Sequence, residues 1–343
     1  MRDVNKVRYD WIDVAKGILI CLMLYGHIQV YGPMDGLKDN GMRLMSCLDG
    51  LYGAFFMQAF FIVTGFCATF KVAFKTYLWK NIKTLMIPTL LLVLFSEYYK
   101  LTLFSHQFNL EPIRNLSHWL VQGGPWFIWA MFWAKIVYWP ISRLNLPYRA
   151  VAVALIYLLG LLSSTLGVVN YQWHQHALLM VPYLFVGEWC RNNMSIVEKW
   201  LKPVAIAGAV SILLQNIIFR LGFFSLPEND FAICLSFRNF PIHVVNCIMG
   251  TAFIFWISRN ICESKKFCTG FFRVLGMGTL VIYLWNGIVY RTIIRTLMPL
   301  YMPDRLFFCV AFHVLALALC YAAFYFIIKL SYGRKAVSWI VGR

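Results

Sequence analysis

Long apolar stretches, separated by short polar segments, follow one another along the whole chain. Each stretch is close to the roughly twenty residues that an α-helix needs to cross the hydrocarbon core of a bilayer. They lie at approximately 11–31, 51–70, 84–104, 125–142, 149–168, 175–192, 203–223, 240–260, 274–296 and 306–328. The pattern predicts an all-α, polytopic membrane protein with about ten transmembrane helices.

Positive charge is divided unevenly between the two sides of these predicted spans. If both termini are cytoplasmic, the inner segments hold twenty of the 31 lysines and arginines, and the outer segments hold eight. Lys16, Lys135 and Arg220 fall within spans. Because basic residues are retained in cytoplasmic loops, we expect both termini to be cytoplasmic. This distribution accounts for the net charge of +17, so we expect no nucleic acid partner.

Composition supports a membrane protein in contact with lipid. Hydrophobic residues make up 61% of the chain and charged residues 13%, whereas charged residues are about a quarter of a soluble domain. We see no repeat, low-complexity tract or soluble appendage, so residues 1–343 are expected to form a single membrane domain. No P-loop, GxSxG or HExxH motif occurs, and we expect no metal site.

The first predicted span carries ionisable residues, which are costly in a bilayer and often mark functional sites. His27 follows Lys16 by about three helical turns, so both lie on one face, with His27 about 16 Å above Lys16. One interpretation is that Lys16 holds an anionic head group while His27 meets its reactive end. The alternative is that Lys16 snorkels and pairs with Asp13, while His27 makes a structural hydrogen bond.

Other polar residues recur at a similar depth in later spans. Singly, each is typical of a hydrogen bond between helices. Together they predict a polar cavity that opens outward, and in the ninth span several share one helix face. These residues are Gln58, Glu97, Gln215, Asn216, His243, Asn246, Thr279, Tyr283, Asn286, Tyr290 and His313.

Two further features have both a topological and a functional interpretation. Lys80 and Lys83 lie one turn apart where the third span meets the cytoplasm. They are either an ordinary positive-inside flank or a phosphate clamp for a cytosolic, nucleotide-bearing donor. Trp126, which follows Pro125 at the start of the fourth span, either belongs to an interfacial aromatic belt or lines a ligand path.

Several segments also carry a family resemblance: residues 9–27, beginning YDWIDVAKGI and ending Gly26-His27, 55–66 (FFMQAFFIVTGF), 80–83 (KNIK), 124–127 (GPWF), 182–187 (PYLFVG) and 275–284 (LGMGTLVIYL). Together they resemble acyltransferase family 3, especially its fucose 4-O-acetylase-like branch. The first span of that family has a basic residue, ten intervening residues and a histidine, which Lys16 and His27 reproduce. Gln58 and Thr64 replace its common proline and serine.

The resemblance implies transfer of an acyl group, usually acetyl from cytosolic acetyl-CoA, to a hydroxyl of an extracytoplasmic carbohydrate or lipid-linked sugar. A multi-pass location in a bacterial inner membrane goes with it. Donor phosphates would rest near Lys16, Lys80 and Lys83, with Trp126 beside the donor. His27 would deprotonate the sugar hydroxyl as general base, and the sequence leaves open whether a covalent acyl-histidine forms.

One position departs from the family pattern. Many members have a histidine two positions after the Tyr-Leu of the late motif, where this chain has Asn286. Because an amide cannot carry a proton as imidazole does, His27 is the main acid–base candidate. Asn286, Gln58 or Tyr283 would donate to the developing oxyanion. The other candidate substrate-binding residues are Asp13, Glu97, His243 and His313.

A transporter or flippase of a glycan or lipid-linked sugar is the alternative from another class. It would use the same cavity without chemistry, and its substrate movement would persist in His27→Ala without acyl-CoA. A membrane scaffold that binds no acyl-CoA is a third interpretation.

Overall fold

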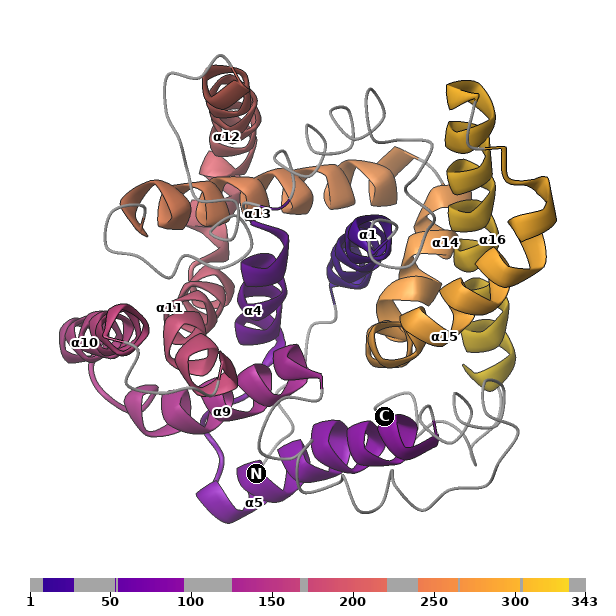
Figure 1. Ribbon diagram of the computed structural model, residues 1–343. Coiled ribbons are helices and arrows are strands. Elements are labelled where there is room, and N and C mark those ends of the chain that lie inside the picture. The colour runs from indigo at the N-terminus through magenta and orange to yellow at the C-terminus, as the bar shows by residue number, and fades with distance from the viewer. Residues whose placement is uncertain are drawn as a thin grey trace.

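The computed structural model describes residues 9–27, 53, 55–95, 125–166, 172–220, 240–264, 266–302 and 305–332. Every regular element in these ranges is a helix, which confirms the predicted all-α class (Figure 1). The helices are α1 (Asp10–Gly26), α4 (Phe56–Cys67), α5 (Phe74–Asn81), the π-helix η2 (Ile82–Met86), α9 (Trp126–Ile141), α10 (Leu146–Thr165), α11 (Gln172–Asn192), α12 (Met194–Arg220), α13 (Phe240–Ser264), α14 (Lys266–Met277), α15 (Thr279–Leu297), the 3₁₀-helix η4 (Met298–Leu300) and α16 (Leu306–Tyr332).

Several of these helices have the length and apolar composition of membrane spans. In the described part of the chain, four qualify: Phe74–Phe95, which contains α5 and η2, Leu146–Thr165, Phe240–Ser264 and Leu306–Ser331. A fifth is obtained if the bent pair Cys268–Met277 and Thr279–Leu300 counts as one span. The count of about ten and the cytoplasmic side of the termini stay predictions.

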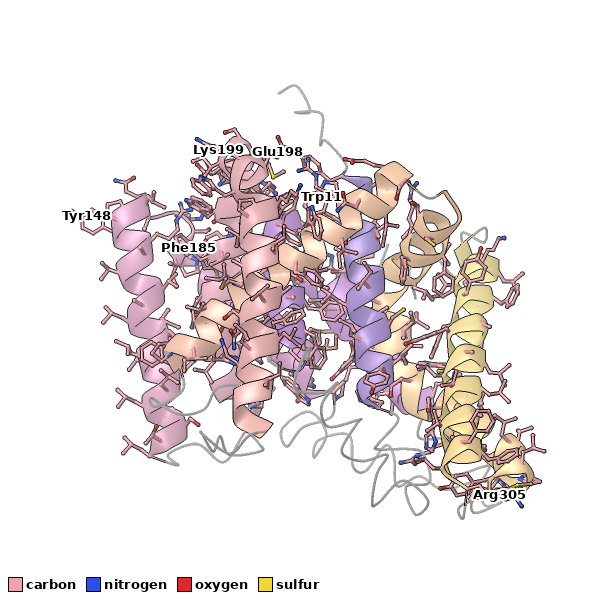
Figure 2. The ribbon with its side chains drawn as sticks, turned by 90° about the horizontal axis from the view of Figure 1, so that it is seen from above. Trp11, Tyr148, Phe185, Glu198, Lys199 and Arg305 are labelled. Atoms are coloured by element: carbon pink, nitrogen blue, oxygen red, sulfur yellow. The ribbon has the colours of Figure 1, made fainter. Side chains whose placement is uncertain are left out.

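The two ends of the helices separate residues in the manner that the charge pattern predicts. Trp11, Tyr148, Glu198 and Lys199 lie toward one end of the molecule, and Arg305 lies at the opposite end (Figure 2). The first group comes from segments that we assigned to the inner side, and Arg305 from a segment that we assigned to the outer side. We use inner and outer for these two ends.

Helix α1 occupies the middle of the arrangement, with α4, α13, α14 and α15 packed around it (Figure 1). Its first residues meet α4 and α13 through aromatic rings: Trp11 lies 5.6 Å from Phe66 and 5.0 Å from Phe255, between ring centroids. The surfaces of α10, α12 and α16 that face away from the other helices expose large aliphatic and aromatic side chains. Such faces suit contact with lipid, because lipid tails are as apolar as these side chains.

Glycines allow the central helices to approach backbone to backbone. A Cβ on Gly65 of α4 would collide with the carbonyl oxygen of Leu184 in α11, and a Cβ on Gly187 of α11 would collide with that of Ile62 in α4. The α1–α14 contact is made in the same way, with Gly276 against the Asp13 carbonyl. Small residues at such contacts are typical of membrane helix pairs, since close packing supplies much of the association energy.

The ninth predicted span is not one straight helix. The sequence pattern placed it at 274–296, whereas the chain breaks between α14 and α15 and turns by 87°. Gly278 caps α15 at this break, and the Ile328 side chain of α16 occupies the space where a Cβ of residue 278 would lie. The prediction of an unbroken span was therefore wrong, because hydropathy does not record the packing that bends a helix.

Candidate functional site

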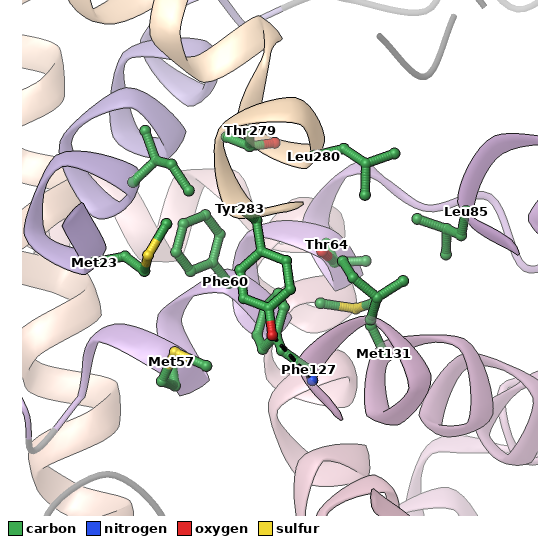
Figure 3. Close-up of a pocket in the computed structure, with 12 residues that line it drawn as sticks. Met23, Met57, Phe60, Thr64, Leu85, Phe127, Met131, Thr279, Leu280 and Tyr283 are labelled. Atoms are coloured by element: carbon green, nitrogen blue, oxygen red, sulfur yellow. Dashed lines mark hydrogen bonds between the residues drawn. The ribbon is translucent and has the colours of Figure 1, made fainter. Parts of the chain in front are cut away.

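A cavity of about 110 Å³ lies between α1, α4, α9, α15 and η2 (Figure 3). Most of its wall is apolar, and Thr64, Thr279 and Tyr283 supply its polar atoms. The hydroxyl of Tyr283 accepts a hydrogen bond from the backbone N–H of Phe127 at 3.4 Å, which joins the first turn of α9 to α15. The site is therefore a partly open cavity in the helix bundle that suits an apolar group with few polar contacts.

The face of α1 on which Lys16 and His27 lie is directed toward this cavity, and we call the residues Lys16, Ile20, Met23 and His27 on this face the α1 stripe. Ile20 and Met23 line the cavity. Lys16 lies one turn inward of Ile20, and His27 lies one turn outward of Met23, so the cavity occupies the depth between the two. Lys16 and His27 therefore lie on the cavity-facing side of α1, one turn beyond the two residues that line the cavity, and neither lines it itself.

At the inner end of this stripe, Lys16 makes an ion pair. Its Nζ lies 3.3 Å from Oδ1 of Asp13, one turn earlier, and both side chains are partly buried. This contact is the one expected from the structural alternative. It also supplies Lys16 with a counter-ion inside the protein.

At the outer end, the hydrogen bond of His27 decides its tautomer. Nδ1 lies 2.8 Å from the Met23 carbonyl oxygen. A carbonyl can only accept, so Nδ1 carries the proton and Nε2 bears the lone pair of the neutral ring. In this tautomer Nε2 is the ring nitrogen that can accept a proton, and the His27 side chain is half-buried.

Asn286 lies on α15 beside the same turn of α1. It is buried, and its Nδ2 donates to the Tyr283 carbonyl at 2.6 Å and approaches the Met23 sulfur at 3.9 Å. Its Oδ1 has no hydrogen-bond partner among the described residues. Because that atom is an acceptor, the geometry favours a bond from a hydroxyl donor over the predicted donation to an oxyanion.

Gln58 and His243 do not line the cavity but bond to each other. Gln58 is fully buried, and its Nε2 donates to His243 Nε2 at 2.9 Å, which links α4 to α13. Gln215 and Asn246 form a similar pair, with amide contacts of 3.0 and 2.7 Å, between α12 and α13. These contacts match the interhelical interpretation that we left open for each residue.

The remaining candidates lie apart from the cavity or outside the described residues. The Nδ1 of His313 donates to the Cys309 carbonyl of its own helix at 2.7 Å, and its ring packs near Tyr301. Trp126 packs edge-on against His176, with ring centroids 4.7 Å apart, next to the cavity residue Phe127. Glu97 lies outside the described residues.

The basic residues at the inner side belong to the helix that runs past the cavity. Lys80 and Lys83 are exposed. Lys83 lies within the π-helix η2 together with Leu85, which lines the cavity. A π-helical turn widens the backbone and is frequently found at functional sites, so the basic pair and the cavity wall share one irregular segment.

Sequence reasoning did not select Lys135 as a site residue. It lies on α9 one turn inward of Met131, which lines the cavity. The sequence did indicate this residue, because a charged side chain inside an apolar span often marks a functional site. The hydropathy pattern alone could not show which helix face it occupies.

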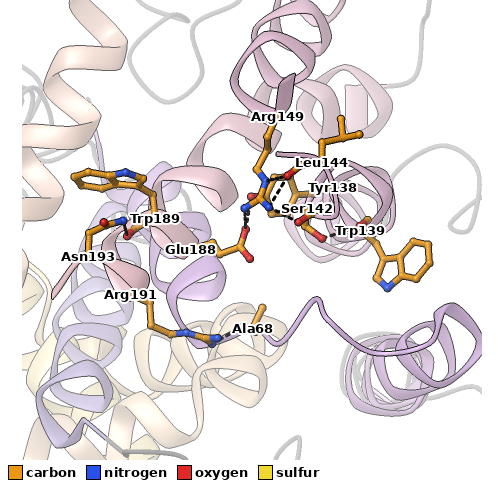
Figure 4. Close-up of polar contacts among 10 residues, drawn as sticks. All are labelled: Ala68, Tyr138, Trp139, Ser142, Leu144, Arg149, Glu188, Trp189, Arg191 and Asn193. Carbon is orange, nitrogen blue, oxygen red and sulfur yellow. Dashed lines mark hydrogen bonds and ion pairs between the residues drawn. The ribbon is translucent and has the colours of Figure 1, made fainter. Parts of the chain in front are cut away.

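A network around Glu188 holds the inner ends of α9, α10 and α11 (Figure 4). Its Oε2 accepts from Tyr138 Oη at 2.5 Å and from Arg149 Nη1 at 3.1 Å. Arg149 also donates to the carbonyls of Ser142 and Leu144, which follow α9. These residues fix the helix that forms one wall of the cavity.

The fold and site together define a helical membrane protein with a cavity between its central helices. The chain belongs to acyltransferase family 3, because the family model, described as an acyltransferase domain, matches residues 9–336. No curated protein and no solved structure matches the chain. The protein is therefore a membrane acyltransferase, which confirms the family resemblance, and no observation favours the transport alternative. The fucose 4-O-acetylase-like branch stays a prediction.

Proposed function

We propose that this acyltransferase moves an acetyl group from cytosolic acetyl-CoA to a hydroxyl of an extracytoplasmic carbohydrate or lipid-linked sugar, in a bacterial inner membrane. The observation that carries this proposal is the placement of α1. Ile20 and Met23 line the cavity, and on the same face of α1 Lys16 lies one turn inward of Ile20 and His27 one turn outward of Met23. The rise between these two ends is about 16 Å, which is comparable to a pantetheine arm.

The donor half of the site follows from the charges on the inner side. The phosphates of acyl-CoA would rest against Lys16, Lys80 and Lys83, since ammonium groups form strong charge-assisted bonds to phosphate. The pantetheine arm and its thioester would then enter the cavity, where Thr64, Thr279 and Tyr283 offer polar atoms to the amide groups of the arm and the apolar side chains surround its methylene groups. Trp126, at the outer start of α9, would close this space next to Phe127.

The chemical step uses the tautomer that the structure sets. His27 Nε2 takes the proton of the sugar hydroxyl, and that oxygen forms a bond to the thioester carbonyl carbon. The carbon–sulfur bond breaks, and the imidazolium returns the proton to the departing CoA thiolate. Tyr283, on the cavity wall, donates to the oxyanion of the intermediate. Asn286 Oδ1 accepts from a second hydroxyl of the acceptor sugar and so orients the sugar before attack.

The test is transfer of label from [¹⁴C]acetyl-CoA to glycan by the purified protein in nanodiscs, with membrane glycolipids and oligosaccharides as acceptors. We expect His27→Ala to lower kcat by about 10²- to 10⁴-fold, the usual contribution of a general base. His313→Ala is the matched control, because His313 makes the same bond to the carbonyl four residues earlier but lies away from the cavity. Transfer at the wild-type rate by a folded His27→Ala variant would refute the mechanism.

Neutralising the inner basic pair gives a second test. Lys80→Gln combined with Lys83→Gln should raise KM for acetyl-CoA more than KM for the acceptor, because the phosphates lose charged partners. Equal effects on the two KM values, or poor insertion of the variant, would favour the topological interpretation of these lysines.

A further inference from the structure

The helix faces of α9 and α4 that line the cavity each continue one turn further inward than the cavity itself. On α9, Ile128 and Met131 line the cavity, and Lys135 continues the same face about 6 Å further inward. On α4, Thr64 lines the cavity and Cys67 follows it one turn later. Lys135 therefore lies on the cavity-facing side of α9, one turn inward of the residues that line the cavity.

Lys135 is a charged residue that has no carboxylate counter-ion among the described residues. It is half-buried, and the groups that act on it electrostatically are the ammonium of Lys80 and the thiol of Cys67. Within the described ranges, no carboxylate pairs with Lys135 or with Lys80. Lys16, in contrast, has Asp13, and Arg149 has Glu188.

Such an arrangement of charges is unfavourable by itself. A partly buried cation without a partner loses hydration that no internal charge replaces, and a second cation nearby adds repulsion. A ligand with two or more negative charges would offset both costs. Phosphate carries such a charge and forms strong charge-assisted hydrogen bonds to ammonium groups.

We infer that Lys135 and Lys80 form a phosphate subsite for the donor nucleotide, inward of the cavity. This inference rests on the proposed function and assigns the phosphates chiefly to the α5–α9 side, because Lys16 on α1 already has Asp13 as its counter-ion. A phosphate held there places the remainder of the donor at the entrance to the space lined by Met131 and Thr64.

Cys67 provides a readout that does not depend on turnover. It is exposed, and it is an electrostatic neighbour of Lys135. Alkylation of Cys67 by N-ethylmaleimide can be followed peptide by peptide with mass spectrometry in the full-length protein. The probe is adenosine 3′,5′-bisphosphate, which carries donor-type phosphates but neither a thiol nor an acyl arm. We expect the probe to slow alkylation of Cys67 in the wild-type protein.

Substitution of Lys135 then tests the subsite. In Lys135→Gln, half-maximal protection should require roughly tenfold more probe, and Lys135→Arg should stay near the wild-type value. Lys199→Gln is the matched control, because Lys199 is an exposed lysine whose ammonium lies 5.8 Å from the Trp200 ring on α12. KM for acetyl-CoA should rise by a similar factor in Lys135→Gln, while KM for S-acetylpantetheine, which lacks phosphate, should not change.

The outcomes separate this inference from the proposed function. If the wild-type protein transfers acetyl but Lys135→Gln is protected as well as wild type, the subsite is refuted and the function stands. If the wild-type protein neither transfers acetyl nor gains protection, both fail. If phosphatidylglycerol nanodiscs protect Cys67 and the bisphosphate does not, the phosphate belongs to a lipid and the donor assignment is overturned.

Discussion

Removal of the Glu188 carboxylate should destabilise the wall of the cavity. Glu188 is 4% exposed, and it accepts hydrogen bonds from Tyr138 and Arg149. Loss of one partner of a buried ion pair costs about 3 kcal/mol or more, because the other charge stays buried. The side chain of Arg149 is 15% exposed and keeps bonds to two carbonyls, so we place Glu188→Ala at the lower end, about 3 kcal/mol.

Other substitutions in the same network should lower the free energy of unfolding by smaller amounts. Glu188→Gln keeps the shape and an acceptor for Tyr138 but loses the charge, so its effect should lie between those of wild type and alanine. Tyr138→Phe removes one hydrogen bond to a charged acceptor and should cost about 1.5 kcal/mol. In a double-mutant cycle, Tyr138→Phe should add little to Glu188→Ala, since both remove the same bond.

The assay is thermal unfolding of the purified protein in one detergent, followed by tryptophan fluorescence. A loss of about 3 kcal/mol corresponds to a fall in Tm of about 4 °C for a chain of this size. Glu198→Ala is the control, because Glu198 also pairs with an arginine, at 2.7 Å, but its side chain is 49% exposed and such pairs contribute little. If Glu188→Ala and Glu198→Ala lower Tm equally, the buried network does not stabilise α9 as argued.

Three further predictions test other contacts. Gly187→Ala should prevent recovery of monodisperse protein on size exclusion, because its methyl group would meet the Ile62 carbonyl, whereas Gly270→Ala, where a Cβ meets nothing within 4 Å, should be recovered normally. Gln58→Leu leaves His243 without its 2.9 Å partner and should lower the free energy of unfolding by about 1–3 kcal/mol, with no change in KM as the check on a purely structural role. Asn286→Ala should raise KM for the acceptor but not for acetyl-CoA, and the reverse pattern in steady-state kinetics would contradict its assignment to the sugar hydroxyl.

Several features of this protein follow from its sequence because they depend on neighbours along the chain. Helix formation in a bilayer satisfies the backbone locally, so apolar stretches of sufficient length predict helices before any partner is known. The stripe from Lys16 to His27 is set by helical periodicity alone, and the structure shows its middle residues, Ile20 and Met23, at the cavity. The family resemblance depended on motifs that are equally local.

Other features were decided by contacts between distant segments. The polar pattern could not distinguish Gln58, which is bonded to His243, from Tyr283, which lines the cavity, because hydropathy does not specify how a helix is rotated against its neighbours. At the break before α15, the side chain of Ile328, fifty positions later, fills the space where a Cβ of residue 278 would lie. Lys135 is only one charge in a span until α4 and α5 bring Cys67 and Lys80 beside it. Sequence therefore determined the helices and the face of α1, and tertiary packing decided which polar groups meet at the cavity.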